Sequence, residues 1–117
     1  MLRGLRGATT VEANTAEIML AETETLLTAM VEQNSLKKED IASAIFTVTN
    51  DLDAAFPAAA ARKMDWTHVP LICAREIPVP NSLPRVIRVL MHINTEKSQL
   101  EMKHVYLKEA VKLRDDL

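Results

Sequence analysis

Apolar side chains fill six of the nine positions between Pro84 and Asn94, a pattern typical of a β-strand inside a sheet. Successive side chains on a strand point to opposite faces, so this stretch divides into two sets. The first face carries Ile87, Val89, Met91 and Ile93, and the second carries Val86, Arg88, Leu90 and His92. Both sets are largely apolar, so we expect both faces to be covered, with Arg88 in the middle of a covered face.

Arg88 is the first candidate functional residue. A guanidinium keeps its charge at any physiological pH, so on a covered face it needs an anionic partner. A glutamate of the protein would make Arg88 structural, whereas a carboxylate of a ligand would make it functional. This stretch of sequence leaves both explanations open.

Residues 1–12 also predict a strand, with Arg6 and Ala8 on one face and Gly7 on the other. Gly4 and Gly7 lie on either side of Arg6, and glycine permits the close approach of another strand or of a ligand. A bulge or a bend is the alternative explanation, and it applies to Gly4 more than to Gly7.

Residues 15–33 show the spacing of an amphipathic helix. Its apolar stripe consists of Ala16, Met19, Leu20, Leu26, Leu27, Met30 and Val31. We expect Asn14 to cap its start, with Glu17 completing a capping box. Glutamates outside the stripe, such as Glu22 and Glu24, are expected to be solvated. This helix is expected to cover a sheet and to carry no chemistry.

The rest of the chain predicts three more strands, over residues 41–49, 66–76 and 104–107, followed by an irregular tail from residue 108. Phe56-Pro57 and the alanines after it predict a short helix. Because this helix lacks bulky apolar side chains, we do not expect it to be deeply buried.

This order of elements predicts an α+β fold, with a mixed β-sheet and one long and one short helix in a single domain over residues 1–117. Two helices are too few to cover both faces of a sheet of four or five strands. We therefore expect another copy of the chain to supply the missing cover.

Composition excludes several classes of function. A net charge of −2 gives no reason to expect nucleic acid or an anionic membrane as a partner, and no apolar run approaches the ~20 residues of a membrane span. The single cysteine, Cys73, excludes an internal disulfide and predicts a reducing cytoplasm. One cysteine and three scattered histidines give no metal-ligand spacing, and two glycines leave no phosphate loop.

Five blocks of residues, in order along the chain, resemble a known family. They are Arg3-Gly4-Leu5-Arg6-Gly7-Ala8-Thr9-Thr10; Phe56-Pro57-Ala58 with Arg62; Val69-Pro70 leading to Cys73-x-x-Glu76; Ile87-Arg88-Val89; and His104-Val105-Tyr106-Leu107 with Ala110-Val111 and Leu113-Arg114. Together they resemble the small monofunctional chorismate mutases of the trimeric, non-all-helical class.

The resemblance implies a homotrimer with a pseudo-α/β-barrel core and with its active sites at subunit interfaces. The implied reaction is the Claisen rearrangement of chorismate to prephenate in phenylalanine and tyrosine biosynthesis, with no cofactor or metal expected. Chorismate is a dicarboxylate, and guanidinium forks suit carboxylates. The rearrangement needs no nucleophile or proton transfer, so catalysis would consist of positioning and of electrostatic stabilisation of the ether oxygen.

The resemblance also implies roles for individual residues. Arg88 would donate to the ether oxygen and to a side-chain carboxylate, Arg6 would bind the same end of the molecule, and Tyr106 would bind a carboxylate. Glu76 and Cys73 would bind the ring hydroxyl. The other implied substrate contacts are the pocket walls Phe56, Ala58 and Leu113, the substrate-binding residue Leu71, and the mobile cations Arg62 and Arg114 at the mouth of the pocket.

Two departures from the family pattern concern affinity: Ala59 stands where relatives often carry a lysine, and Ile72 where they carry a more polar residue. Two other functions remain open. One is a non-catalytic trimeric module that binds small carboxylates, and the other is an imine or enamine deaminase of a similarly shaped trimeric family. Glu76 can be only a structural partner of Arg88, and the three histidines are expected to be structural.

Overall fold

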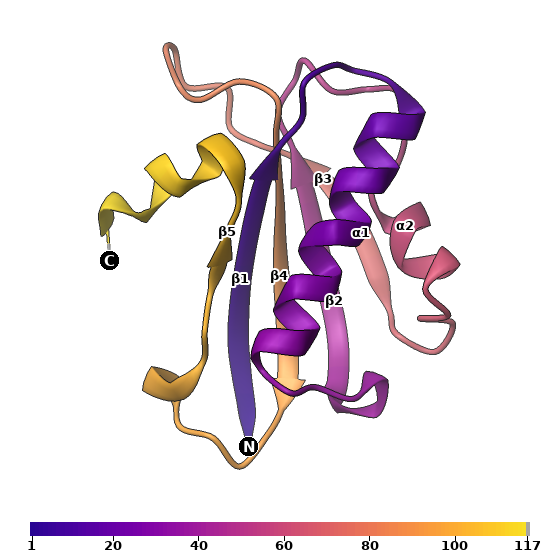
Figure 1. Cartoon of the computed structure of the whole chain (residues 1–117), viewed down its shortest axis with the longest axis vertical. Helices are drawn as coiled ribbons and strands as arrows, with labels where there is room; N and C mark the ends of the chain where they lie inside the picture. The colour runs from indigo at the N-terminus through magenta and orange to yellow at the C-terminus, as the bar shows by residue number, and fades with distance from the viewer. Residues whose placement is uncertain (117) are drawn as a thin grey trace.

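The computed structural model describes the backbone of residues 1–116 and the side chains of residues 1–114 of the 117-residue chain. Within these residues the elements are β1 (Leu2–Thr10), α1 (Ala16–Gln33), η1 (Lys38–Asp40), β2 (Ile41–Val48), α2 (Ala58–Lys63), β3 (Leu71–Arg75), β4 (Val86–Asn94), η2 (Gln99–Glu101), β5 (Val105–Tyr106) and η3 (Lys108–Asp116), where η marks a 3₁₀ helix (Figure 1).

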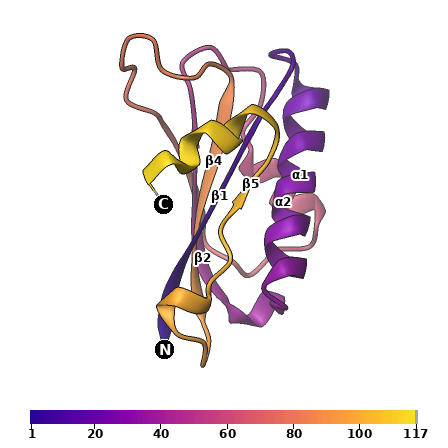
Figure 2. The ribbon, with the colours of Figure 1, turned by 60° about the vertical axis from the view of Figure 1, so that its left-hand side comes forward.

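The five strands form one mixed sheet in the order β3-β2-β4-β1-β5. The central strand β4 is antiparallel to both of its neighbours, whereas the outer strands β3 and β5 are parallel to β2 and β1. Both α-helices lie on the same side of this sheet (Figure 2). The predicted α+β class, with a mixed sheet and one long and one short helix, is therefore confirmed.

The hydrophobic core fills the space between the sheet and α1. One face of β4 contributes Ile87, Val89, Met91 and Ile93, each at most 2% exposed. Met19, Leu26, Leu27 and Met30 of α1 are fully buried against the sheet. Each such side chain contributes about 1.5–3 kcal/mol through removal of its surface from water.

The opposite face of β4 is open, so the expectation that both faces are covered is wrong for the single chain. The side chain of Arg88 is 47% exposed, and Leu90 on the same face is 36% exposed. The reason is the placement of both α-helices on one side of the sheet, which leaves the other side without a covering layer.

Gly7 lies on the covered face and allows α1 to approach β1 closely. A Cβ atom at this position would lie 2.3 Å from Sδ of Met30 and 3.2 Å from a methyl carbon of Leu26. Within the chain, the close approach that this glycine permits is made by helix α1.

The cap of α1 differs from the prediction. The hydroxyl of Thr15 accepts a hydrogen bond of 3.2 Å from the backbone N–H of Ile18, so Thr15 is the N-cap. Asn14 instead binds the loop after β2: its amide donates to Asp53 Oδ1 at 2.7 Å, and its Oδ1 accepts from the N–H groups of Asp53 and Ala54. The long-range bonds of Asn14 fix this loop beside the start of the helix.

The short helix α2 is buried more deeply than expected. Ala58, Ala60 and Ala61 are each at most 2% exposed, and α2 packs against α1. The prediction failed because small alanine side chains let two helices approach closely, which compensates for their lack of bulk.

One strand boundary and the structure of the C-terminal segment also differ from the prediction. The third strand begins at Leu71 rather than at Trp66, whose side chain is buried in the preceding turn. The segment after β5, expected to be irregular, forms the 3₁₀ helix η3.

Candidate active site

Four of the predicted site residues, Arg6, Glu76, Arg88 and Tyr106, line one cavity of about 270 Å³ on the open face of the sheet. The strand register explains this arrangement. Arg88 lies between Ala8 of β1 and Thr47 of β2, and Ala8 is also paired with Tyr106 of β5. Arg6 is two residues from Ala8 and therefore points to the same face.

Glu76 forms an ion pair with the guanidinium of Arg88 on its Nε side. Glu76 directly follows β3, and its backbone N–H donates to the carbonyl of Val48 at 2.9 Å. Its Oε2 lies 3.5 Å from Nε of Arg88 and also accepts a hydrogen bond from the Thr47 hydroxyl. An arginine has five N–H donors, and this contact engages the one on Nε.

Thr47 is a site residue that the sequence reasoning missed. Its signal was a polar position between two buried residues, Phe46 and Val48, on a predicted strand. Such a position faces the opposite side of the sheet from its neighbours, and here that side holds the cavity.

The helix η3 brings two further predicted residues to this region. The guanidinium carbon of Arg114 lies 5.7 Å from the ring centroid of Tyr106, within the range of a cation–π contact. Leu113 lines an adjoining hollow of about 210 Å³ together with Glu76 and Arg88. We call Arg6, Glu76, Arg88, Tyr106, Leu113 and Arg114 the arginine group.

His104 supports the backbone of Arg6. The β1–β5 ladder begins at Gly7 and Val105, and one residue earlier the N–H of Arg6 donates to Nδ1 of His104 at 2.9 Å. Burial lowers the pKa of His104, and the nearby charges of Arg6 and Arg114 lower it further. The imidazole is therefore kept neutral, which lets Nδ1 accept this hydrogen bond.

This arrangement predicts an acid-sensitive fold. Because the folded chain has the lower His104 pKa, the unfolded chain binds the proton more readily, and stability declines as pH falls below the ordinary value of 6.5. His104→Asn retains an acceptor oxygen near the Nδ1 position. We expect its melting temperature to match the wild type at about pH 7.5 and to fall less than the wild type by about pH 5.5.

A calorimetric series across this pH range measures both proteins. His104→Phe, which has no acceptor and no titrating group, is the control. We expect it to be less stable than the wild type by about 1 kcal/mol at about pH 7.5, with a smaller difference at about pH 5.5. Equal acid sensitivity of the wild type and His104→Asn would assign the decline to other groups.

The remaining predicted residues lie elsewhere in the chain. Phe56 and Cys73 line a cavity of about 390 Å³, and Arg62 and Leu71 line a separate hollow of about 250 Å³. Ala58 is buried at the start of α2. We call these five residues the Phe56 group.

Cys73 and Glu76 are therefore not brought together within one chain. Cys73 is paired with Phe46, whose side chain is in the core, so Cys73 faces the covered side of the sheet. Glu76 lies beyond the end of β3 and reaches the open side. Any ligand contacting both residues must meet them from two different chains or after a rearrangement.

The described residues contain no group of three or more His, Cys, Asp or Glu side chains arranged to hold a metal ion. None of the helices in the described part of the chain has both the length and the apolar character needed to cross a membrane.

Comparison with known proteins gives a consistent result. The family model of chorismate mutase type I matches residues 2–117. The chain is 55% identical to chorismate mutase AroH of Thermus thermophilus over 118 residues, covering 100% of this chain and 97% of the relative. It is 44% identical to chorismate mutase AroH of Bacillus subtilis, covering 100% of this chain and 93% of that relative.

A solved chorismate mutase from Clostridium thermocellum superimposes with a TM-score of 0.92 at 57% identity, covering 93% of this chain and 97% of that one. Sequence and structure thus agree over nearly the whole length. The chain belongs to the chorismate mutase type I family.

Proposed function

We propose that this chorismate mutase rearranges chorismate to prephenate at the arginine group, by positioning the substrate and stabilising negative charge on its ether oxygen. The observation that carries the proposal is the shared cavity of Arg6, Arg88 and Tyr106, three side chains that come from three strands. Two guanidinium groups and a phenol in one cavity suit a small dicarboxylate.

The proposed roles combine these contacts with those that the family resemblance implies. Arg88 is held at Nε by Glu76 and offers its guanidinium to the ether oxygen, where negative charge develops as the bond breaks. Arg6 and Tyr106 bind carboxylate oxygens, and Glu76 accepts a hydrogen bond from the ring hydroxyl. The reaction proceeds without a nucleophile, a proton donor or a cofactor, because bond breaking and bond formation occur within one molecule held in a folded conformation.

We further propose that the working enzyme is a homotrimer whose sites lie between chains. The cavity of about 270 Å³ falls just below the ~300–1,000 Å³ of most small-molecule sites, as expected for a half-site. The Phe56 group lies apart from the arginine group and would complete the site from a neighbouring chain. Large apolar side chains, namely Phe56, Ile72, Ile77 and Val79, are more than half exposed and would be covered in this assembly.

The enzyme is expected to act in the cytoplasm, in the biosynthesis of aromatic amino acids. The single Cys73 supports a reducing compartment.

Incubation of the purified protein with chorismate tests the proposal. Loss of chorismate absorbance with stoichiometric appearance of prephenate is the expected result. Saturable binding without turnover would favour the carboxylate-binding module. Turnover of an imine substrate, with chorismate left intact, would favour the deaminase.

Replacing Cys73 by serine separates this mechanism from covalent catalysis. We expect Cys73→Ser to retain kcat within about tenfold of the wild type, because no thiolate attack is required and a hydroxyl also forms hydrogen bonds. Steady-state kinetics with chorismate provide the measurement. Complete inactivity of a folded Cys73→Ser protein would contradict the proposal and point to a nucleophilic thiolate.

A further inference from the structure

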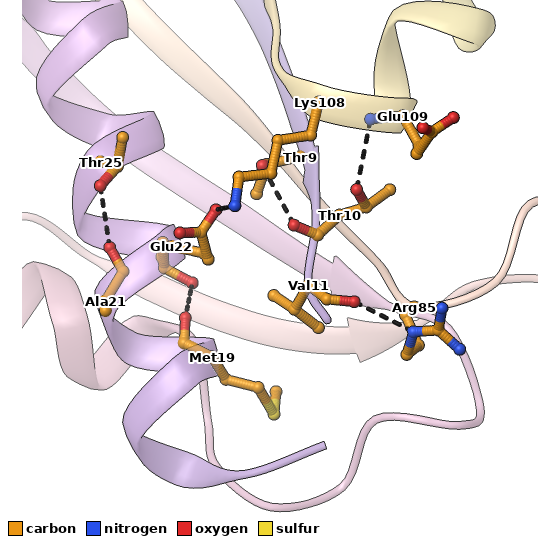
Figure 3. Close-up of polar contacts among 11 residues, drawn as sticks. Thr9, Thr10, Val11, Met19, Ala21, Glu22, Thr25, Arg85, Lys108 and Glu109 are labelled. Carbon is orange, nitrogen blue, oxygen red and sulfur yellow. Dashed lines mark hydrogen bonds and ion pairs between the residues drawn. The ribbon is translucent and has the colours of Figure 1, made fainter. Parts of the chain in front are cut away.

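Glu22 and Lys108 form an ion pair at the edge of the sheet formed by β1 and β5. Nζ of Lys108 lies 2.9 Å from Oε2 of Glu22 (Figure 3). Only 19% of the Glu22 side chain is exposed, and Oε2 itself is shielded from solvent. The expectation that Glu22 belongs to a solvated helix face is therefore wrong.

The ammonium of Lys108 is the ion-pair partner of this shielded oxygen. The two groups form an ion pair at hydrogen-bonding distance. The same contact raises the pKa of Lys108 above its ordinary value. The Lys108 side chain is 46% exposed, so loss of Lys108 would leave the shielded Glu22 carboxylate without compensation, whereas loss of Glu22 would leave a partly solvated ammonium.

The backbone of Lys108 is also unusual. Its φ of 52° lies in the left-handed region, which favours glycine and costs free energy for other residues. This conformation turns the chain from β5 into η3. A lysine at a position that suits glycine indicates that its side chain makes a stabilising contact. The ion pair with Glu22 is such a contact.

Two neighbouring bonds attach the same turn to β1. The N–H of Leu107 donates to the carbonyl of Ala8 at 2.9 Å, and the N–H of Glu109 donates to the Thr10 hydroxyl at 3.3 Å. Glu22 adds an attachment to α1 on the covered side of the sheet (Figure 3). The start of η3 is thus fixed to both layers of the fold.

We propose that Glu22 is a positioning residue, whose ion pair with Lys108 fixes the start of η3 and so holds Leu113 and Arg114 at the mouth of the cavity. Leu113 lines the hollow beside Arg88, and Arg114 lies over Tyr106. The pair acts from the far side of the sheet and touches no substrate. The inference rests on the roles proposed above for the arginine group.

The experiment compares Glu22→Gln and Lys108→Met with the matched control Lys112→Met. Lys112 forms its own ion pair with Glu109 at 2.8 Å in the same helix, but these side chains are 69% and 64% exposed. Lys112→Met therefore removes an ammonium from η3 without loosening its attachment, since exposed pairs contribute little.

Two readouts are measured on the full chain. Hydrogen exchange is expected to accelerate at the amides of Glu109 and Ala110 in both Glu22→Gln and Lys108→Met, and not in Lys112→Met. KM for chorismate is expected to rise about 5- to 10-fold in the first two variants with kcat within about twofold, because Leu113 and Arg114 contact bound substrate rather than the breaking bond.

The double variant Glu22→Lys/Lys108→Glu, which restores the pair with reversed charges, is expected to recover both readouts. Wild-type exchange rates and wild-type KM in folded Glu22→Gln and Lys108→Met would overturn the inference, as would an equal effect of Lys112→Met. A wild type that does not turn over chorismate would instead overturn the proposed function, while the exchange rates would still decide whether the pair fixes η3.

Discussion

Replacing Arg88 by lysine is expected to lower kcat by about 100-fold or more, nearly as far as replacement by alanine. Loss of one donor to a developing negative charge typically costs about 3 kcal/mol. The ammonium of lysine keeps the charge but lacks the planar fork of the guanidinium. It therefore cannot replace the contact of Arg88 Nε with Glu76 and at the same time present separate N–H groups to the substrate. Steady-state kinetics with chorismate, on proteins of confirmed fold, measure the loss.

Arg3→Lys is the matched control. Arg3 lies on the same sheet, donates from Nε to the carbonyl of Lys97 at 3.1 Å and does not line the cavity. We expect wild-type kcat from this variant. Near-normal turnover by Arg88→Lys would show that charge alone is sufficient and would remove the proposed role of the fork.

Mixing two inactive variants is expected to restore activity if the sites are shared between chains. Arg88→Ala disables the arginine group, and Phe56→Glu places a carboxylate in the Phe56 group, where it would repel a dicarboxylate substrate. Phe56 is 72% exposed in the single chain, so this change is compatible with folding. Each variant alone is expected to lack activity.

In trimers assembled at random from equal amounts, about one quarter of the sites combine two unmodified halves. Unfolding and refolding the two variants together should therefore restore about a quarter of the wild-type rate, whereas refolding each one separately should restore none. Mass spectrometry of the mixture verifies that mixed trimers have formed. No recovery in proven mixed trimers would place each complete site within one chain.

The secondary-structure elements were predictable from the sequence where a single local pattern of apolar residues dominated. Helix α1 and strands β1, β2 and β4 follow from hydrophobic periodicity, because a long apolar stripe or alternation has few alternative explanations. The cap of α1 was not predictable in the same way. Asn14 has the chemistry of an N-cap, but its side chain is used by the loop at Asp53, which is distant in sequence.

Part of the candidate site was also predictable. Arg6, Arg88 and Tyr106 were identified by residue type and by resemblance, and the strand register places them in one cavity. Thr47, His104 and Glu22 were not identified, because each acts through a partner that is distant in the sequence. Nothing in the local pattern connects His104 to the backbone of Arg6 or Glu22 to Lys108.

The sequence by itself determined which residues alternate across each strand, and hence which side chains share a face, because side-chain direction on a strand is a local property. It also determined the α+β class, and through the family resemblance it predicted that two arginines bind a dicarboxylate. Only the tertiary structure decided which face of the sheet stays open and that the Phe56 group lies apart from the arginine group. These outcomes depend on how strands pair and on which side the helices pack, and both are set by contacts between residues far apart in the chain.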